Sequence, residues 1–265
     1  MLYFVGTPIG NLKDISYRAV EVLNGVDEIA CEDTRHSATL LARYEIKKPL
    51  FSYHKFNEKE AGEKIIEKLK AGKNIAVISD AGMPVISDPG NVLCKLLIEE
   101  GLEFTVVPGA SACLSALLLS GLDSSRFTFL GFLPQKAGER REFLEKYKSL
   151  DTTLIFYSAP HDVKKDVESI YEVFGERTCV AVKEITKMFE RAERFNLKDG
   201  YQSDPKGEYV LVIEGFSGED FSNLSEKEHI DKYLSQGMDK KEALKRVAKE
   251  RGVSKSSLYK YTIEY

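Results

Sequence analysis

The sequence has no tryptophan and few of the residues that build disulfides or metal sites. Its 265 residues include only four cysteines and four histidines. The cysteines are far apart, no two form a CxxC pair, and none has a histidine at the spacing of a metal site. We therefore expect small buried thiols and no metal site, and histidine-based nucleophilic catalysis has little support. The cysteines are Cys31, Cys94, Cys113 and Cys179.

Long apolar runs are also missing. No stretch of 18 or more apolar residues occurs, so the sequence predicts no membrane-spanning helix. The opening residues read as a strand followed by Gly6, without the basic and apolar regions of a signal peptide. The formal net charge of −4 is unremarkable. We expect a cytoplasmic protein with no membrane partner, long enough for two domains or one large one.

Strand-like apolar runs alternate with helical patterns along most of the chain. This alternation is typical of βαβ units and predicts an α/β protein with a mainly parallel sheet. Helices are predicted at 58–71, 162–174 and the very apolar stretch 112–122, which we expect to be buried between a sheet and a partner. The predicted strands are Leu2–Val5, Glu28–Cys31, 74–78, Phe104–Val107, Phe127–Phe132, 153–157, 179–183 and 209–214.

The last forty residues differ in character. A polar segment at 215–223 reads as a linker, and from Asp239 to Lys260 there are eight Lys and Arg against three Asp and Glu. Apolar pairs, then Gly252 and Ser254, resemble a helix-turn-helix with a glycine turn and a serine N-cap. The tail either contacts nucleic acid or packs as a solvated helical hairpin. The predicted domains are 1–122, 123–220 and 221–265.

Three of the predicted strands end in loops of small, flexible residues, at 6–12, 79–90 and 108–112. The loop at 79–90 also carries two carboxylates, Asp80 and Asp88. In an open α/β sheet, ligands bind beyond the carboxyl ends of the strands, where such loops bring backbone close to a small molecule. Any one loop alone could be an elaborate turn, but three together favour a ligand site.

Seven short segments of the sequence occur in the same order as the motifs of one enzyme family. They are VGTPIGNL at 5–12, EDTR at 32–35, the loop 79–90, PGASA at 108–112, GFLP at 131–134, KEITK at 183–187 and GEYV at 207–210. Across nearly the whole chain they resemble the ribosomal RNA small subunit methyltransferase I family, the 16S rRNA cytidine 2'-O-methyltransferases of the tetrapyrrole methylase fold. The chain departs from the family pattern at Met83, where Thr is usual, and at 158–162, where Ser-Ala-Pro-His-Asp replaces Glu-Ser-Pro-His-Arg.

The resemblance implies two α/β domains with S-adenosylmethionine in the cleft between them, a helical C-terminal extension and a homodimer. It implies transfer of a methyl group to the 2'-hydroxyl of a cytidine ribose in 16S rRNA of the small ribosomal subunit. Matched by motif, the expected cofactor contacts are Pro8, Ile9, Asp80, Gly82, Met83, Ile86, Ser111, Ala112, Phe156 and Glu208.

Methyl transfer to a hydroxyl requires positioning and a base that removes the proton. The candidate bases are Glu32, Asp33, Asp80, Asp88 and Glu184, together with Lys187 if burial lowers its pKa. We expect a catalytic site containing Glu32, Asp33, Arg35, Asp88 and Lys187, without assigning one base.

Simpler interpretations of the same residues remain. Asp33 or Thr34 could cap a helix at 37–44, with Glu32 and Arg35 paired. The lysines and Glu184 of the KEITK segment at 183–187 could form a solvated ion-pair cluster.

An acidic chain needs local basic surfaces to hold RNA. The candidates are Lys136, Arg140 and Arg141, together with the tail. The aromatic residues Phe51, Tyr53 and Phe56, interleaved with His54 and Lys55, could stack on a base, although a core strand would also explain Phe51 and Tyr53.

Three other functions compete with this interpretation. Asp80 and Asp88 could hold Mg²⁺ for phosphoryl chemistry, although no P-loop is present. The same fold could methylate a small tetrapyrrole, or the chain could bind RNA without catalysis.

Overall fold

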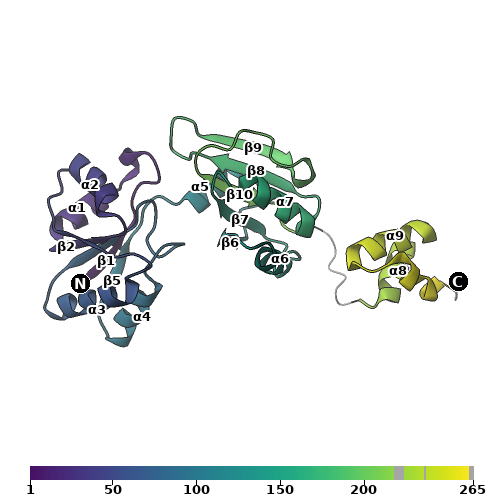
Figure 1. The fold of residues 1–265 in the computed structure, drawn as a ribbon, viewed down its shortest axis with the longest axis horizontal. Coiled ribbons are helices and arrows are strands. Elements are labelled where there is room, and N and C mark those ends of the chain that lie inside the picture. The colour runs from purple at the N-terminus through teal and green to yellow at the C-terminus, as the bar shows by residue number, and fades with distance from the viewer. Residues whose placement is uncertain (218–223, 236, 263–265) are drawn as a thin grey trace. The chain divides into compact units, whose positions relative to one another are not determined.

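The computed structural model describes residues 1–217, 224–235 and 237–262. The chain forms two compact units, Met1–Phe216 and Ser217–Tyr265. The larger unit contains two five-stranded sheets with helices around them, drawn in purple to green in Figure 1. Among the described residues, no helix has both the length and the apolar character needed to cross a bilayer.

The first sheet is entirely parallel, with strand order β3-β2-β4-β1-β5. Its strands are β1 (Leu2–Val5), β2 (Glu28–Cys31), β3 (Leu50–Ser52), β4 (Ile75–Ile78) and β5 (Phe104–Val107). The accompanying helices are α1 (Tyr17–Gly25), α2 (Thr34–Arg43), α3 (Glu58–Lys70) and α4 (Asn91–Glu99), with the short helix η1 (Leu12–Asp14) after the first strand. Because all five strands run the same way, the loops after them meet at one edge of the sheet.

Side chains that alternate along these strands make two cores, one on each face of the sheet. Leu2 and Ile75 pack with α3 and α4 on one face, whereas Ile29 and Ile78 pack with α1 and α2 on the other. The central strands β1, β2 and β4 are mostly buried on both faces, which explains their strong apolar signal in the sequence, whereas the edge strands β3 and β5 are partly exposed.

The second sheet is mixed, with strand order β6-β7-β10-β8-β9. Its strands are β6 (Phe127–Phe132), β7 (Thr153–Ser158), β8 (Thr178–Lys183), β9 (Arg191–Asn196) and β10 (Tyr209–Ile213). Only β6 and β7 pair in parallel, and the other pairs are antiparallel. Helices α6 (Ala137–Glu145) and α7 (Val163–Phe174) and the short helix η2 (Leu197–Asp199) belong to this part.

The prediction of two α/β parts is confirmed, but a mainly parallel arrangement is wrong for the second sheet. Strand β10 runs antiparallel to both β7 and β8, and β8 forms an antiparallel hairpin with β9, a strand that sequence analysis did not find. This edge strand reads Arg-Ala-Glu-Arg-Phe-Asn and is largely polar, so it lacks the apolar alternation of a half-buried strand. The alternative of a core strand for Phe51 and Tyr53 is confirmed only in part, because β3 is an edge strand of half-buried and exposed residues, and the buried Tyr53 follows it.

Helix α5 (Ala112–Ser120) follows β5 and packs on β7, β8 and β10 of the second sheet. Cys113, Ala116 and Leu117 face that sheet and are buried. Leu114, Leu118 and Leu119 are exposed on its other side. The predicted division of the chain at residue 122 stays a prediction.

The smaller unit contains α8 (Glu226–Ser235), α9 (Lys240–Arg251), α10 (Lys255–Leu258) and the short helix η3 (Tyr259–Thr262) around an apolar cluster. Gly252 ends α9 in the left-handed region, and the Ser254 hydroxyl caps α10, so the predicted glycine turn and serine cap are confirmed. Of the predicted linker 215–223, residues 218–223 lie outside the described part of the chain.

Candidate functional site

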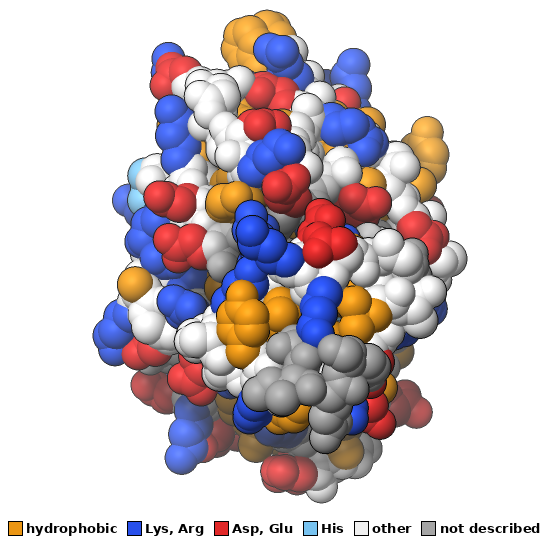
Figure 2. All heavy atoms as spheres, turned by 90° about the vertical axis from the view of Figure 1, so that its right-hand side faces the viewer, with side chains coloured by type: hydrophobic (Ala, Val, Ile, Leu, Met, Phe, Trp, Pro, Cys, Tyr) orange, Lys and Arg blue, Asp and Glu red, His pale blue; other side chains and the backbone are white. Residues whose placement is uncertain are grey.

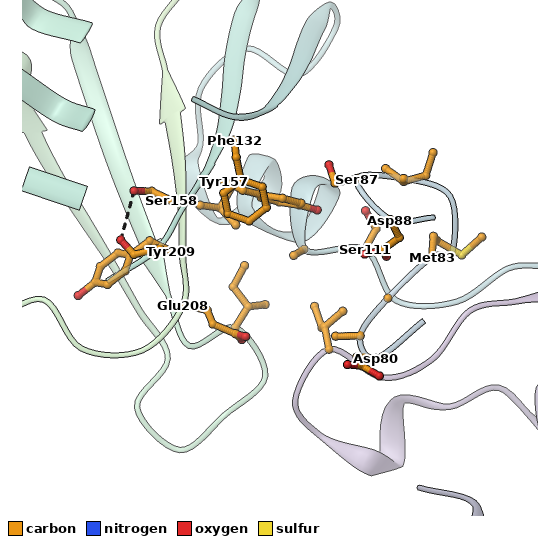
Figure 3. Close-up of a pocket in the computed structure, with 18 of the residues that line it drawn as sticks. Asp80, Met83, Ser87, Asp88, Ser111, Phe132, Tyr157, Ser158, Glu208 and Tyr209 are labelled. Carbon is orange, nitrogen blue, oxygen red and sulfur yellow. Dashed lines mark hydrogen bonds between the residues drawn. The ribbon is translucent and has the colours of Figure 1, made fainter. Parts of the chain in front are cut away.

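A cavity of about 440 Å³ lies between loops of the first sheet and the second sheet, within the Met1–Phe216 unit. Figure 3 shows Phe132, Tyr157 and Glu208 on one wall, facing Met83, Asp88 and Ser111 on the other. The lining residues are Ile9, Asp80, Ala81, Gly82, Met83, Ile86, Ser87, Asp88, Ser111, Ala112, Phe132, Tyr157, Ser158, Ala159, Pro160, Ile185, Glu208, Tyr209 and Val210.

The three small-residue loops lie against one another, which confirms that they converge. The Thr7 amide donates to the Gly82 carbonyl (2.9 Å), and the Gly82 amide donates back to the Thr7 carbonyl (3.2 Å). A Cβ on Gly6 would lie 2.7 Å from the Gly109 Cα and 2.7 Å from the Met83 sulfur. Glycine is required at this approach because any side chain would separate the loops.

The loop 79–90 has an unusual backbone. Val85 and Ser87 have φ values of 76° and 66°, in a region that a β-branched residue rarely adopts. Such strain persists only where neighbouring structure holds it, and it clusters at functional sites. Here the Glu58 carboxylate accepts hydrogen bonds from the amides of Gly90 (2.7 Å) and Val92 (3.2 Å) at the start of α4, and so anchors the end of the loop.

Carboxylates gather at the first-sheet side of the cavity. Burial, with the negative charge of Glu32 nearby, raises the pKa of Asp88 to about 6. Burial, with the charge of Asp80, also raises the pKa of Glu32. Asp80 accepts a hydrogen bond from the Asp33 amide (3.3 Å). Asp88 is therefore a cavity carboxyl that changes charge close to neutral pH.

On the opposite wall, a lysine neutralises part of the charge of two glutamates. Lys187 Nζ lies 2.9 Å from Glu184 Oε1 and 2.8 Å from Glu208 Oε2, and the Glu208 amide donates to Glu184 Oε1 (3.0 Å). Burial alone would lower the pKa of Lys187, but the hydrogen bonds to Glu208 and Glu184 outweigh it, and the pKa is raised. Lys187 therefore stays protonated, and the prediction that burial might make it a base is wrong.

Most of the predicted cofactor contacts lie together on this cavity. They are Ile9, Asp80, Gly82, Met83, Ile86, Ser111, Ala112 and Glu208. Pro8 is not a lining residue, although Ile9 beside it is. Phe156 is fully buried in the core on the other face of β7, and its neighbour Tyr157 lines the cavity instead. The Phe156 prediction is therefore corrected by one residue, because successive side chains on a strand point to opposite faces.

Of the predicted catalytic residues, Asp88 lines the cavity and Glu32, Asp33, Arg35 and Lys187 do not. Asp33 caps α2 by accepting from the Arg35 amide (2.8 Å), as the simpler interpretation expected. Arg35 pairs with Asp33 (3.2 Å) rather than with Glu32, and its side chain is 91% exposed. The two residues form a helix cap at the surface, and Glu32 acts on Asp88 through its charge.

Sequence analysis missed several residues of the second wall, and alternation along β7 was the signal that could have found some of them. Tyr157 lies on the face of β7 opposite Phe156 and lines the cavity, as does Ser158 at the end of the strand, and the Tyr157 ring packs on Phe132 (5.5 Å between centroids). Burial raises the pKa of Tyr157 to about 12, so its hydroxyl stays protonated.

Two predicted RNA contacts are excluded by burial. Arg140 is buried and donates to Ser169 Oγ and to the carbonyls of Pro134 and Gln135, so it holds a turn together. Tyr53 is buried and donates to Glu58 (3.2 Å).

Other candidates for RNA contact remain at the surface. Phe51 is covered by Lys68, whose Nζ lies 4.2 Å from the ring centroid, whereas Phe56 is 95% exposed. Lys136 and Arg141 are also exposed, with Lys136 paired to Glu139.

The thiols are largely as predicted, since Cys31, Cys113 and Cys179 are buried, Cys94 is half-buried and all four are free. In the described ranges, no three side chains of His, Cys, Asp and Glu are arranged to hold a metal ion.

Comparison with known proteins places this architecture in one family. The model for Tetrapyrrole (Corrin/Porphyrin) Methylases matches residues 1–199. Ribosomal RNA small subunit methyltransferase I of Bacillus subtilis is 42% identical over 270 residues, covering 98% of this chain and 92% of the relative. The protein of the same name from Haemophilus influenzae is 42% identical over 274 residues, covering 100% and 97%.

A solved structure also has the same fold. A diphthine synthase superposes with a TM-score of 0.64 at 16% identity, over 81% of this chain and 89% of that one. The fold, the converging loops and the full-length relatives together show that the chain belongs to the ribosomal RNA small subunit methyltransferase I family of tetrapyrrole methylases.

Proposed function

We propose that this protein transfers a methyl group from S-adenosylmethionine to the 2'-hydroxyl of a cytidine ribose in 16S rRNA of the small ribosomal subunit. The observation that carries the proposal is the cavity itself, in which one carboxyl with a pKa of about 6, Asp88, faces a wall of apolar side chains. The names of the relatives support the rRNA of the small subunit as the substrate.

The cavity fits the methyl donor in size and chemistry. Its volume of about 440 Å³ lies within the range of sites for small molecules and cofactors. Asp80, Asp88 and Glu208 give it negative charge, which suits a cationic sulfonium and disfavours polyphosphates. Ile9, with Gly82 beside it, contributes apolar wall, and a Cβ on Gly82 would lie 3.2 Å from Ile9 Cγ2.

When bound, S-adenosylmethionine supplies an electrophilic methyl group. The residues of the chain must then hold the ribose hydroxyl, take its proton and exclude water. Asp88 is the best placed base, since a base is most effective when its pKa lies near the working pH. Tyr157 and Phe132 close the opposite side with packed rings.

The RNA requires positive charge outside this acidic cavity. We assign part of it to the smaller unit, where Lys241, Lys245 and Lys249 are exposed at four-residue spacing along α9. Figure 2 shows Lys and Arg side chains interleaved with Asp and Glu on the face drawn there, so charge on that face is mixed. We therefore expect RNA to contact the exposed lysines of α9 and not a broad basic surface.

The homodimer is proposed on a separate observation. Helix α5 is apolar all round, yet Leu114, Leu118 and Leu119 are exposed on the side away from the second sheet. A helix of this kind is normally covered on both sides, and a second copy of the chain would cover it. The cytoplasmic location stays a prediction.

The test is methylation of small ribosomal subunits from cells that lack this protein, with labelled S-adenosylmethionine and mapping of 2'-O-methyl ribose. The proposal predicts label at one cytidine of 16S rRNA. Label on a base, or on a precorrin-type tetrapyrrole but not on the subunit, would overturn it. Calorimetry with S-adenosylmethionine separates both outcomes from RNA binding without catalysis.

A further inference from the structure

The turn between β3 and α3 exposes an aromatic ring that no part of the described chain covers. Phe56 is 95% exposed, and only the His54 ring lies beside it, edge-on at 6.0 Å between centroids. Both faces of this ring are therefore open to a partner, and covering them would remove apolar surface from water.

The turn that carries Phe56 is held rigidly. Asn57 Oδ1 accepts from the His54 amide (2.8 Å), Asn57 Nδ2 donates to the Ser52 carbonyl (3.1 Å), and the Asn57 amide donates to the His54 carbonyl (3.0 Å). Because the backbone of this turn is already fixed, only the two side-chain torsions of Phe56 lose freedom when a partner stacks on its ring.

The same turn is joined to the cavity loop. Glu58, two residues after Phe56, binds the Gly90 and Val92 amides at the end of the loop that carries Asp88. It also accepts from Tyr53, which fixes the start of the turn. Since β3 pairs with β2 in parallel, the turn leaves the sheet at the edge where Glu32 lies, and His54 is close enough to act on the Glu32 carboxyl. Phe56 is therefore tied through Glu58 to the catalytic loop.

Charge around the ring suits a nucleic acid strand. Lys55 and Lys59 flank Phe56 and are exposed, and within the described residues neither has an ion-pair partner. Single-stranded RNA binds to surfaces that combine an aromatic ring for a base with cations for the phosphates. A protein partner would favour a wider apolar patch, whereas here one ring stands between two cations.

We propose that Phe56 is a stacking platform for an unpaired RNA base next to the nucleotide to be methylated, with Lys55 and Lys59 contacting the flanking phosphates. The proposal rests on the proposed function, because it assigns one recognition residue for that RNA. Stacking holds the strand so that the target ribose enters the cavity. Phe56 is a positioning residue, since it does not touch the reacting atoms.

The test compares Phe56→Ala, Phe56→Leu and Phe56→Trp in methylation of unmodified small subunits, with KM and kcat measured separately. Loss of one stacked base predicts a rise of roughly tenfold or more in KM for the subunit in the Ala variant, with kcat at saturation little changed. The Trp variant should restore the wild-type KM, and the Leu variant should not. Calorimetric affinity for S-adenosylmethionine should be unchanged in all three.

The control is Ile98→Ala, which removes a 68% exposed apolar side chain near the far end of α4. Its KM should equal that of wild type. If the Ala variant keeps the wild-type KM while wild type methylates the subunit, the proposal that Phe56 stacks on a base is wrong, but the proposed methyltransferase function is unaffected. If the Leu variant works as well as Trp, the contact is apolar rather than stacking and the inference also fails. Absence of methylation by wild type instead overturns the proposed function.

Discussion

The two sheets of the larger unit face the same cavity but contribute different chemistry. On the parallel-sheet side, burial and the negative charge of neighbouring carboxylates raise the pKa values of Asp88 and Glu32. The mixed sheet brings Glu184 and Glu208 with Lys187 between them, so its charges are balanced. In the proposed mechanism Asp88 removes the proton on the first-sheet side, and the second sheet closes the cavity.

The largest expected effect comes from Asp88→Asn. Without its base the enzyme should lose about 10²- to 10⁴-fold in kcat, because the amide cannot accept the proton. Methyl transfer to small subunits measures this, and Glu99→Gln, an exposed carboxylate on α4, is the control. A variant within a few-fold of wild type would assign the base to another residue.

The second largest effect is expected where the loops after the first sheet pack closely at Gly6. Gly6→Ala places a Cβ 2.7 Å from Gly109 and Met83, which should cost roughly 1–3 kcal/mol of unfolding free energy and weaken binding of S-adenosylmethionine. Gly25→Ala, at the end of α1 with open space around it, is the matched control and should be neutral or slightly stabilising. Denaturant unfolding and calorimetry measure both. Equal stability of the two variants would contradict the close approach.

The pH profile sharpens the same contrast. The wild-type kcat/KM should rise about tenfold per pH unit below an apparent pKa of about 6 and level off above it, and Asp88→Asn should lack this limb. A limb near the pKa of an amine would instead indicate a lysine.

The free energy of unfolding should fall as pH rises, whereas kcat/KM should rise. Because the folded pKa of Asp88 exceeds the ordinary aspartate value of 3.8, the folded state binds more protons between pH 3.8 and about 6, and stability falls as pH rises through this window. Asp88→Asn should therefore stabilise the protein at pH 7 by about 1 kcal/mol, a value reduced for partial solvation of the carboxyl. In thermal unfolding this gain should shrink as pH falls toward 4, and a gain that grows there would contradict the sign.

A substitution on the second sheet, Lys187→Met, should have a smaller effect on stability and on kcat. Lys187→Met leaves Glu184 and Glu208 without their cation and should reduce the unfolding free energy by about 1 kcal/mol, discounted for solvent exposure. Its kcat should fall less than about tenfold, because a protonated amine takes no proton. Lys198→Met, which breaks a surface pair with Glu176, is the control. A loss of a hundredfold or more would move the chemistry to the second sheet.

The smallest effect is expected in the tail. Replacing Lys241, Lys245 and Lys249 by Ala should weaken subunit binding a few-fold and reduce the salt dependence of log K by roughly 0.7 for each lost phosphate contact. Affinity for S-adenosylmethionine should not change. Lys95→Ala on α4 is the control, and an unaltered salt slope in the triple variant would leave α9 as a helix that only packs in its own unit.

Much of the fold was predictable because its central strands are buried on both faces. Continuous apolar runs such as Ile75–Ile78 give a signal that needs no partner strand to interpret. The edge strand Arg191–Asn196 gave none, because its pairing partner and not its composition makes it a strand.

The candidate site was predictable where loops carried their own signature and not where side-chain direction mattered. The small residues of the first-sheet loops indicated the cavity, and Asp88 was among the candidates. Only the structure shows that Tyr157, and not Phe156, lies on the cavity face of β7. Likewise, only the carbonyls that Arg140 binds show that it is a buried structural residue and not an RNA contact.

The sequence by itself determined the parallel sheet, the converging loops and the set of carboxylates, because apolar periodicity and turn residues act locally along the chain. Tertiary structure alone decided which carboxylate has a pKa near neutrality and which charges are neutralised. Lys187 and Asp88 are 99 positions apart in sequence, and their ionisation depends on burial and on neighbours that only folding brings to within a few ångströms.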